Sequence, residues 1–181
     1  MDATPADAPA VTRSRARNTA IGLLARREHA QSEIQRKLRD RGYDAEITHE
    51  VVDELTQQRL LSDERFAAVF IRSRAERGQG PVRLRAELRQ LRLPNELIEQ
   101  RLREAEVEWS DLACAIRLRK FGKAQPKSLS ERAKQVRFLQ YRGFTAEHIR
   151  AAMDSFDVDD LLEADADDPA ADDPQNLDPD L

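Results

Sequence analysis

The chain has 181 residues, of which 35% are charged and only 5% are aromatic, and it has one cysteine, Cys114. The shortage of aromatic side chains argues against a compact enzyme with a deep pocket, and a single cysteine excludes an internal disulfide or a cysteine-rich metal site. All 30 Lys and Arg lie in residues 1–150, which therefore carry a net charge of +8, whereas residues 151–181 carry −12.

The chain starts with a segment rich in Ala, Pro and Asp, residues 1–12, which we expect to be disordered. Three helices are then predicted by apolar residues that recur at helical spacing, over residues 15–27, 31–41 and 45–58. Gly42 can supply the left-handed residue that ends the second helix, and Asp44 is a favourable N-cap for the third.

The central stretch predicts a second group of three helices. The apolar face of its first helix is formed by Phe66, Ala67 and Phe70. Gly78 and Gly80 end this helix, and Pro81 begins the next because the first helical position needs no amide donor. The apolar stripe of that next helix is Leu84, Leu88 and Leu91. Pro94 and Asn95 begin the last helix, which we expect to bury Leu97, Ile98 and Leu102.

A third group of helices is predicted over residues 110–121, 130–142 and 145–155. In this group Gly143 ends the second helix and Thr145 caps the third. Beyond Phe156 the sequence is acidic, rich in Ala and Pro, and has no face to bury, so we predict a disordered tail over residues 157–181. This tail either only solvates the protein or folds back on the basic body and competes with nucleic acid.

The three groups of helices repeat at an interval of about fifty residues. Intervals of 50 and 51 residues separate three leucines, Leu38, Leu88 and Leu139. The same intervals separate Gly42, Arg92 and Gly143. A fixed period implies stacked supersecondary units. We therefore predict an all-α fold, an elongated, curved array of three tandem three-helix repeats over residues 13–60, 61–108 and 109–156.

The sequence contains no catalytic or metal-binding constellation. None of the three histidines, His29, His49 and His148, has a second histidine three or four residues away, so we expect surface or capping roles for them. Cys114 lies among apolar neighbours, which indicates a small buried residue. We predict a protein that is not an enzyme and that has no cofactor, no metal and no small-molecule substrate.

Basic residues fall into three groups, and these are the candidate binding residues. The candidates are Lys37, Arg39, Arg72, Arg74, Arg77, Arg83, Arg85, Arg89, Lys120 and Lys123. Each group is either an ordinary exposed helix face or a contact surface, because the net positive charge of residues 1–150 attracts a polyanionic partner. Arg85 and Arg89 favour a contact role most, because the matching positions of the other repeats are not both basic.

Several segments of the chain, taken in order and spacing, resemble the regulatory protein RecX family, the modulators of the RecA recombinase. The segments are LLARREHAQSEIQRKLRDRGY (23–43), LLSDERFA (60–67), IRSR (71–74), GQGPVRLRAEL (78–88) and VRFLQYRGF (136–144). The resemblance implies three tandem three-helix repeats that bind the RecA nucleoprotein filament along its groove. It also implies inhibition of strand exchange, ATP hydrolysis and coprotease activity, and hence restraint of the SOS response.

Two positions depart from the family pattern. Ala30 stands where the family usually has a Ser that would pair with Glu33 in a capping box, so we expect Ser32 with Gln35 to cap the helix one turn later. Arg92 replaces the glycine of the other two repeats, and we expect an extended Leu93 before Pro94 to let the chain turn there.

The expected partners are the RecA filament and, weakly and without sequence preference, single- or double-stranded DNA. No apolar run approaches the roughly 20 residues of a membrane span, so we expect no membrane partner and, by elimination, a cytoplasmic protein, which we take to be a monomer. The alternative is a stand-alone DNA-binding protein, such as a helix-turn-helix-like transcription regulator, because three-helix units with basic helices permit that role too.

Overall fold

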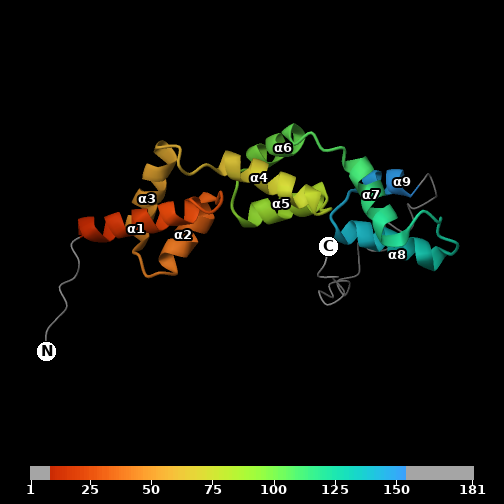
Figure 1. Cartoon of the computed structure of the whole chain (residues 1–181), viewed down its shortest axis with the longest axis horizontal. Helices are drawn as coiled ribbons and strands as arrows, with labels where there is room; N and C mark the ends of the chain where they lie inside the picture. Colours follow the sequence, from red (N-terminus) through yellow and green to blue (C-terminus); the bar gives the residue numbers. More distant parts are fainter. Residues whose placement is uncertain (1–8, 154–181) are drawn as a thin grey trace, which may run out of the picture. The chain divides into compact units, whose positions relative to one another are not determined.

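The computed structural model describes residues 9–153, and within them it contains nine α-helices and no strand (Figure 1). In chain order these are α1 (Pro9–Leu24), α2 (Gln31–Arg39), α3 (Ala45–Gln57), α4 (Asp63–Glu76), α5 (Pro81–Gln90), α6 (Asn95–Glu104), α7 (Trp109–Phe121), α8 (Leu129–Tyr141) and α9 (Ala146–Ala152). The helices group in threes as the sequence predicted, which confirms the all-α fold of three tandem three-helix repeats.

Contacts divide the chain into two compact units. The first unit holds the residues up to 70 together with 88–101, and the second holds 71–87 together with the residues from 102 on. The elongated arrangement stays a prediction, as do the repeat boundaries at 60/61 and 108/109. None of the helices in the described part of the chain is long and apolar enough to cross a membrane.

The first helix begins earlier than predicted. Residues 9–12, which we expected to be disordered, lie in α1, where Pro9 occupies a position that needs no amide donor. α1 also ends at Leu24, short of the predicted 27. The remaining part of the expected N-terminal disorder and the acidic tail over 157–181 lie outside the described residues.

Each repeat turns at one left-handed residue after its second helix. These residues are Gly42, Arg92 and Gly143, with φ of 84°, 62° and 85°. The N–H group that follows donates to the carbonyl of a leucine five residues earlier, and the pairs are Tyr43 to Leu38 (3.3 Å), Leu93 to Leu88 (3.2 Å) and Phe144 to Leu139 (3.1 Å). The same helix ending thus recurs three times, which confirms the fifty-residue register. Arg92 itself adopts the left-handed conformation at the middle turn, although it is not a glycine.

The first and the third repeat each close on a small apolar core. The buried cluster of the first repeat is Ala16, Ala20, Ile34, Leu38, Val51, Val52, Leu55 and Leu61. That of the third is Ala113, Ile116, Val136, Leu139, Phe144, Ile149, Ala152 and Met153. In the middle repeat the buried apolar residues are Phe66, Ala67, Ile71, Ala75, Leu84, Leu88, Leu93, Ile98 and Leu102. Phe70, Leu91 and Leu97 are only half-buried, which corrects three of the core positions that we predicted.

The start of α2 is capped from another repeat. Ala30 has no side-chain acceptor, and the free N–H of Gln31 donates instead to Oδ1 of Asp63, at the start of α4, at 2.8 Å. The expected capping by Ser32 is wrong, because its hydroxyl donates to the carbonyl of Leu91 at 2.5 Å. Both hydrogen bonds join the first repeat to the second within the first unit.

A buried carboxylate and histidine complete that helix start. Oε2 of Glu33 accepts the N–H of Ala30 at 3.2 Å and lies 3.3 Å from Nδ1 of His29, while Arg27 donates to both carboxylate oxygens. Burial and the nearby Arg27 guanidinium lower the pKa of His29, outweighing the opposing effect of Glu33. The ring is therefore neutral at pH 7 and its Nδ1–H donates to the carboxylate.

We expect stability to fall as the pH drops below about 6.5, the ordinary pKa of histidine, because the unfolded chain then binds a proton that folded His29 resists. His29→Gln should flatten the dependence of the urea midpoint on pH between 5 and 7. His148, whose pKa burial also lowers, is present in both proteins, so part of the dependence on pH remains in the variant. Parallel curves for the two proteins would contradict this assignment.

Backbone groups join the second repeat to the third within the second unit. The N–H of Gly80 donates to the carbonyl of Arg142 at 2.7 Å, and the N–H of Val82 donates to the carbonyl of Gly143 at 2.9 Å. A Cβ atom on Gly80 would lie 2.3 Å from the carbonyl oxygen of Gly143, so only glycine permits this approach. The α4–α5 turn and the α8–α9 turn are therefore held against each other.

Candidate nucleic-acid interface

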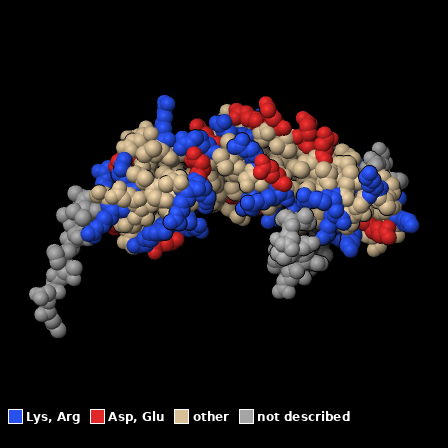
Figure 2. Space-filling model, in the orientation of Figure 1, with Lys and Arg blue, Asp and Glu red and all other residues tan. Residues whose placement is uncertain are grey.

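Six of the ten candidate residues lie on or between α4 and α5, around the glycine-rich turn. Arg72 and Arg74 lie on α4 and Arg77 directly after it, whereas Arg83, Arg85 and Arg89 lie on α5. On the face shown in Figure 2, Lys and Arg side chains gather over α5 and α8, and Asp and Glu side chains gather over α6. On that face the basic side chains over α5 and α8 are therefore grouped together.

Glu87 partly neutralises two of the candidates. Its Oε1 lies 2.9 Å from Nε of Arg83, and its Oε2 lies 3.6 Å from Nε of Arg74. The hydrogen bond to Glu87 raises the pKa of Arg83 above its ordinary value. Arg74 and Arg83 therefore share one carboxylate, a pairing that the sequence alone did not reveal.

Two other candidates on α4 and its end carry unneutralised charge. Arg72 is exposed, and no carboxylate of the described residues pairs with it, not even Glu76 one turn on. The side chain of Arg77 is exposed as well. Exposed guanidinium groups of this kind can bind an anionic partner without first breaking an internal ion pair.

Arg85 and Arg89, for which the sequence favoured a contact role most, differ in their surroundings. Arg89 is exposed and donates from Nε to the side-chain amide oxygen of Asn95 at 2.9 Å. This neutral acceptor orients the guanidinium group without neutralising its charge. Arg85 is half-buried, and its guanidinium helps to lower the pKa of His148 on α9.

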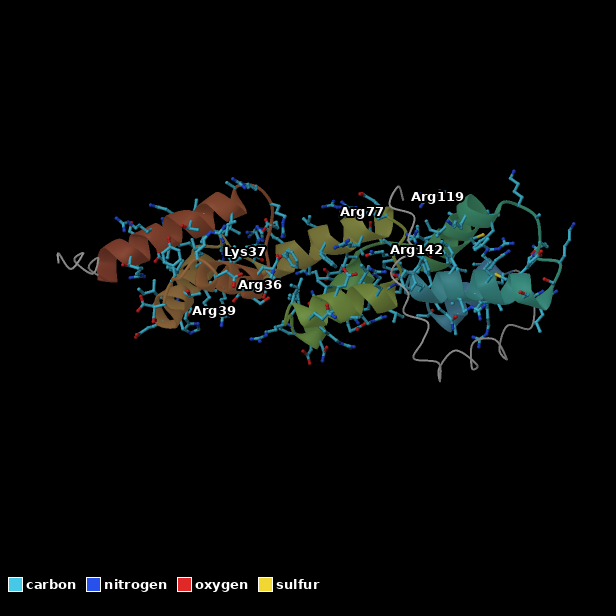
Figure 3. The ribbon with its side chains drawn as sticks, turned by 90° about the horizontal axis from the view of Figure 1, so that it is seen from below. Arg36, Lys37, Arg39, Arg77, Arg119 and Arg142 are labelled. Atoms are coloured by element: carbon cyan, nitrogen blue, oxygen red, sulfur yellow. The ribbon has the colours of Figure 1, made fainter. Side chains whose placement is uncertain are left out.

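The candidates of the first repeat lie on α2. Figure 3 shows Arg36, Lys37 and Arg39 together on that helix. Arg39 is exposed and donates from Nε to the carbonyl of Gln35 at 3.3 Å. Cations in the last turn of a helix also interact favourably with its carbonyl end.

The candidates of the third repeat, Lys120 and Lys123, are exposed at and after the end of α7. Arg117 belongs to the same run of basic residues, but only 2% of it is exposed. Its Nε donates to the side-chain oxygen of Gln135 at 3.0 Å. Arg117 is therefore an internal residue and is not available to a partner.

The ten candidates are distributed over both units. Lys37, Arg39 and Arg89 belong to the first unit, and the other seven belong to the second. The structure also brings Arg119 and Arg142, which are not among the ten, close to Arg77 and Arg83. Arg142 directly precedes the turn glycine of its repeat, as Arg41 does in the first repeat. This repetition is the sequence feature that could have identified Arg142 as a candidate.

The histidines and the cysteine follow the sequence expectations only in part. His29 is buried, so a surface role is wrong for it, whereas Nδ1 of His148 accepts the N–H of Thr145 at 3.3 Å, which confirms a capping role. Cys114 is half-buried against the core of the third repeat, less buried than predicted. Across residues 9–153, no group of three or more His, Cys, Asp or Glu side chains is placed to hold a metal ion.

Family models cover most of the chain. The model of the first RecX three-helix domain matches residues 16–55, that of the second matches 62–102, and that of the third matches 106–153. The matched segments contain all of the candidate residues up to Arg89 as well as Lys120 and Lys123.

Similar proteins carry the same description. The chain is 48% identical to a regulatory protein RecX of Halorhodospira halophila over 144 residues, which are 80% of this chain and 89% of that protein. It is 44% identical to a regulatory protein RecX of Pseudomonas putida, over 80% of this chain and 92% of the relative. Among solved structures, a crystal structure of regulatory protein RecX matches with a TM-score of 0.69 at 22% identity, over 86% of this chain and 81% of the other. RecX from Lactobacillus salivarius matches with a TM-score of 0.65 at 16% identity, over 86% and 97%. The chain therefore belongs to the RecX family of regulatory proteins.

Proposed function

We propose that the protein regulates the RecA recombinase without catalysing a reaction. It binds RecA and its nucleoprotein filament and inhibits strand exchange, ATP hydrolysis and coprotease activity, and it thereby modulates recombination, DNA repair and the SOS response. It acts in the cytoplasm as a monomer, and it contacts single- or double-stranded DNA weakly and without sequence preference. Membership of the RecX family is the observation that carries this proposal.

The distribution of charge supports a polymeric, anionic partner. Basic residues lie on helices of all three repeats, and exposed ones such as Arg72, Arg77 and Lys123 have no carboxylate partner among residues 9–153. Several weak contacts on one chain add up to strong binding when the partner repeats along its length. We therefore assign the contact surface to the ten basic candidates, Lys37, Arg39, Arg72, Arg74, Arg77, Arg83, Arg85, Arg89, Lys120 and Lys123.

Titrating the protein into RecA-driven ATP hydrolysis on single-stranded DNA should inhibit that hydrolysis at stoichiometric or lower concentration. Arg85→Ala combined with Arg89→Ala should raise the concentration needed for half-inhibition about tenfold, since exposed ion pairs contribute roughly 0.2–1 kcal/mol each and 1.4 kcal/mol is tenfold. Arg103→Ala with Arg137→Ala removes the same charge from other exposed positions and should change the inhibition much less.

Full inhibition by the Arg85 and Arg89 double variant, with unchanged helix content, would remove these residues from the contact surface. No inhibition by the unaltered protein would reject the regulatory proposal itself. Binding to one DNA sequence in preference to random DNA by orders of magnitude would instead favour the transcription regulator.

A further inference from the structure

Three arginines of the second unit lie close together where the α4–α5 turn meets the α8–α9 turn. We call Arg83, Arg119 and Arg142 the arginine cluster; they come from α5, α7 and the end of α8. Figure 3 shows Arg119 and Arg142 near Arg77, which directly follows α4. Nη2 of Arg119 lies 3.8 Å from the position that a Cβ atom on Gly78 would take, so its side chain reaches the same turn.

Arg142 is fixed in place from two sides. Its Nη1 donates to the carbonyl of Arg77 at 3.1 Å, and its Cζ lies 5.3 Å from the centre of the Phe138 ring. Its Nε is buried without a hydrogen-bond partner, and no described residue accepts a bond from Nη2. The guanidinium is therefore held rigidly, with donor capacity that the described part of the protein does not use.

Arg83 is also oriented by an aromatic ring and by close packing. Its Cζ lies 5.7 Å from the centre of the Tyr141 ring, and its Cβ lies so near Gly143 that a Cβ atom there would overlap it. Backbone hydrogen bonds from Gly80 and Val82 clamp the same two turns together. A site built this way exists before any ligand arrives, so little conformational entropy is lost on binding.

The cluster holds more positive charge than its carboxylates balance. Burial and then the charges of Arg119 and Arg83 lower the pKa of Arg142. Neither Arg119 nor Arg142 pairs with a carboxylate of residues 9–153, and the Glu87 carboxylate near Arg83 is shared with Arg74. Like charges that crowd at a fixed distance destabilise the free protein, and a bound anion would relieve that repulsion.

We propose that the arginine cluster is a preformed binding site for a phosphate group, which in the protein's natural setting is a backbone phosphodiester of DNA. The planar forks of several guanidinium groups match the oxygen atoms of one phosphate, and stacked guanidinium groups are weakly hydrated. The assignment rests on the proposed function only for the source of that phosphate, the DNA of the filament.

The test compares two double variants without RecA. Affinity for a labelled thirty-residue single-stranded oligonucleotide is measured by fluorescence anisotropy over a range of salt concentrations. Arg119→Gln with Arg142→Gln should weaken binding about tenfold at low salt and reduce the steepness of the salt dependence by roughly 0.7 for each phosphate that is no longer neutralised. Arg103→Gln with Arg137→Gln removes the same charge from exposed positions outside the cluster and should change both quantities much less.

Two single variants guard against misfolding, and measurements with pyrophosphate separate the possible sources of the phosphate. Arg119→Gln alone alters an exposed side chain and should show the same effect in part, and Arg142→Lys keeps the charge but loses the fork and should not restore affinity. Inorganic pyrophosphate should compete with the oligonucleotide and should raise the melting temperature of the unaltered protein more than that of the cluster variant.

The outcomes of these measurements separate the alternatives. Equal losses of affinity in the cluster and control variants would overturn the site, and so would a cluster variant that keeps full affinity and the full response to pyrophosphate. Stabilisation by pyrophosphate through the cluster with unchanged oligonucleotide binding would keep a phosphate site but assign it to a free phosphate compound. Because the binding assay contains no RecA, failure of this site leaves the regulatory proposal standing, and failure of inhibition leaves the site standing.

Discussion

Gly80→Ala is expected to lower the free energy of unfolding of the second unit by about 2–4 kcal/mol, the combined cost of overpacking and of a broken hydrogen bond. The added methyl group would lie 2.3 Å from the carbonyl oxygen of Gly143 and 2.6 Å from the nitrogen of Phe144, and both are backbone atoms that cannot rotate away. The two turns must separate, and the bond from the N–H of Gly80 to Arg142 breaks with them.

Two other glycines provide matched controls. Gly22 lies in α1 with nothing within 4 Å, so Gly22→Ala should stabilise the protein by about 0.5–1 kcal/mol. Gly42 has φ of +84° and equally open surroundings, so Gly42→Ala isolates the cost of the left-handed backbone, roughly 1–2 kcal/mol. Gly22 and Gly42 lie in the first unit, so urea unfolding is followed by far-ultraviolet circular dichroism, which reports on the helices of both units, and by the fluorescence of Trp109, the only tryptophan, which reports on the second. A Gly80→Ala midpoint within error of the unaltered protein would contradict the close contact.

Gln135→Leu is expected to destabilise the third repeat by about 1.5–3 kcal/mol, because it removes a hydrogen-bond acceptor from a buried charge. Only 2% of Arg117 is exposed, and its Nε bonds to Oε1 of Gln135 at 3.0 Å. Its Nη2 reaches Oε1 of Gln125 at 3.4 Å, a weaker contact that remains in the variant. A buried guanidinium that loses a partner keeps its full desolvation cost.

The reciprocal change should behave differently. Arg117→Met removes the buried charge and keeps most of the apolar volume, but it leaves the side-chain oxygen of buried Gln135 without its donor, so it should cost about 1 kcal/mol, less than Gln135→Leu. Combining Arg117→Met with Gln135→Leu should recover most of the stability that Gln135→Leu alone loses. Additive losses in the double variant, again followed by Trp109 fluorescence, would show that the two residues do not act as a pair.

Local features of the sequence predicted the helices well. Pro81, Asn95 and Thr145 stand at or next to the starts of α5, α6 and α9, and Gly143 ends α8, because capping and backbone preferences act within a few residues. The sequence predicted that Phe70 is buried, whereas its neighbour Ile71 is the buried residue. The two are neighbours about 100° apart on the helix, and only the packing partner decides which one is covered.

Contacts between distant residues could not be predicted in this way. The sequence identified Arg77 and Arg83 as candidates but not their proximity to Arg119 and Arg142. That proximity depends on how two distant turns meet, since Arg77 and Arg142 are 65 residues apart in the chain. The pairing of Arg74 and Arg83 with Glu87 depends likewise on the packing of α4 against α5. The candidate surface was thus predicted as a set of charges, and its geometry came from the tertiary structure.

The cap that Asp63 provides for α2 bears on how the chain acquires its structure during synthesis. When only the residues up to 60 have left the ribosome, Asp63 is still missing and the N–H of Gln31, at the start of α2, must bond to water. The first repeat reaches its final hydrogen bonding only when the beginning of the second emerges, so maturation of neighbouring repeats is coupled in the order of translation.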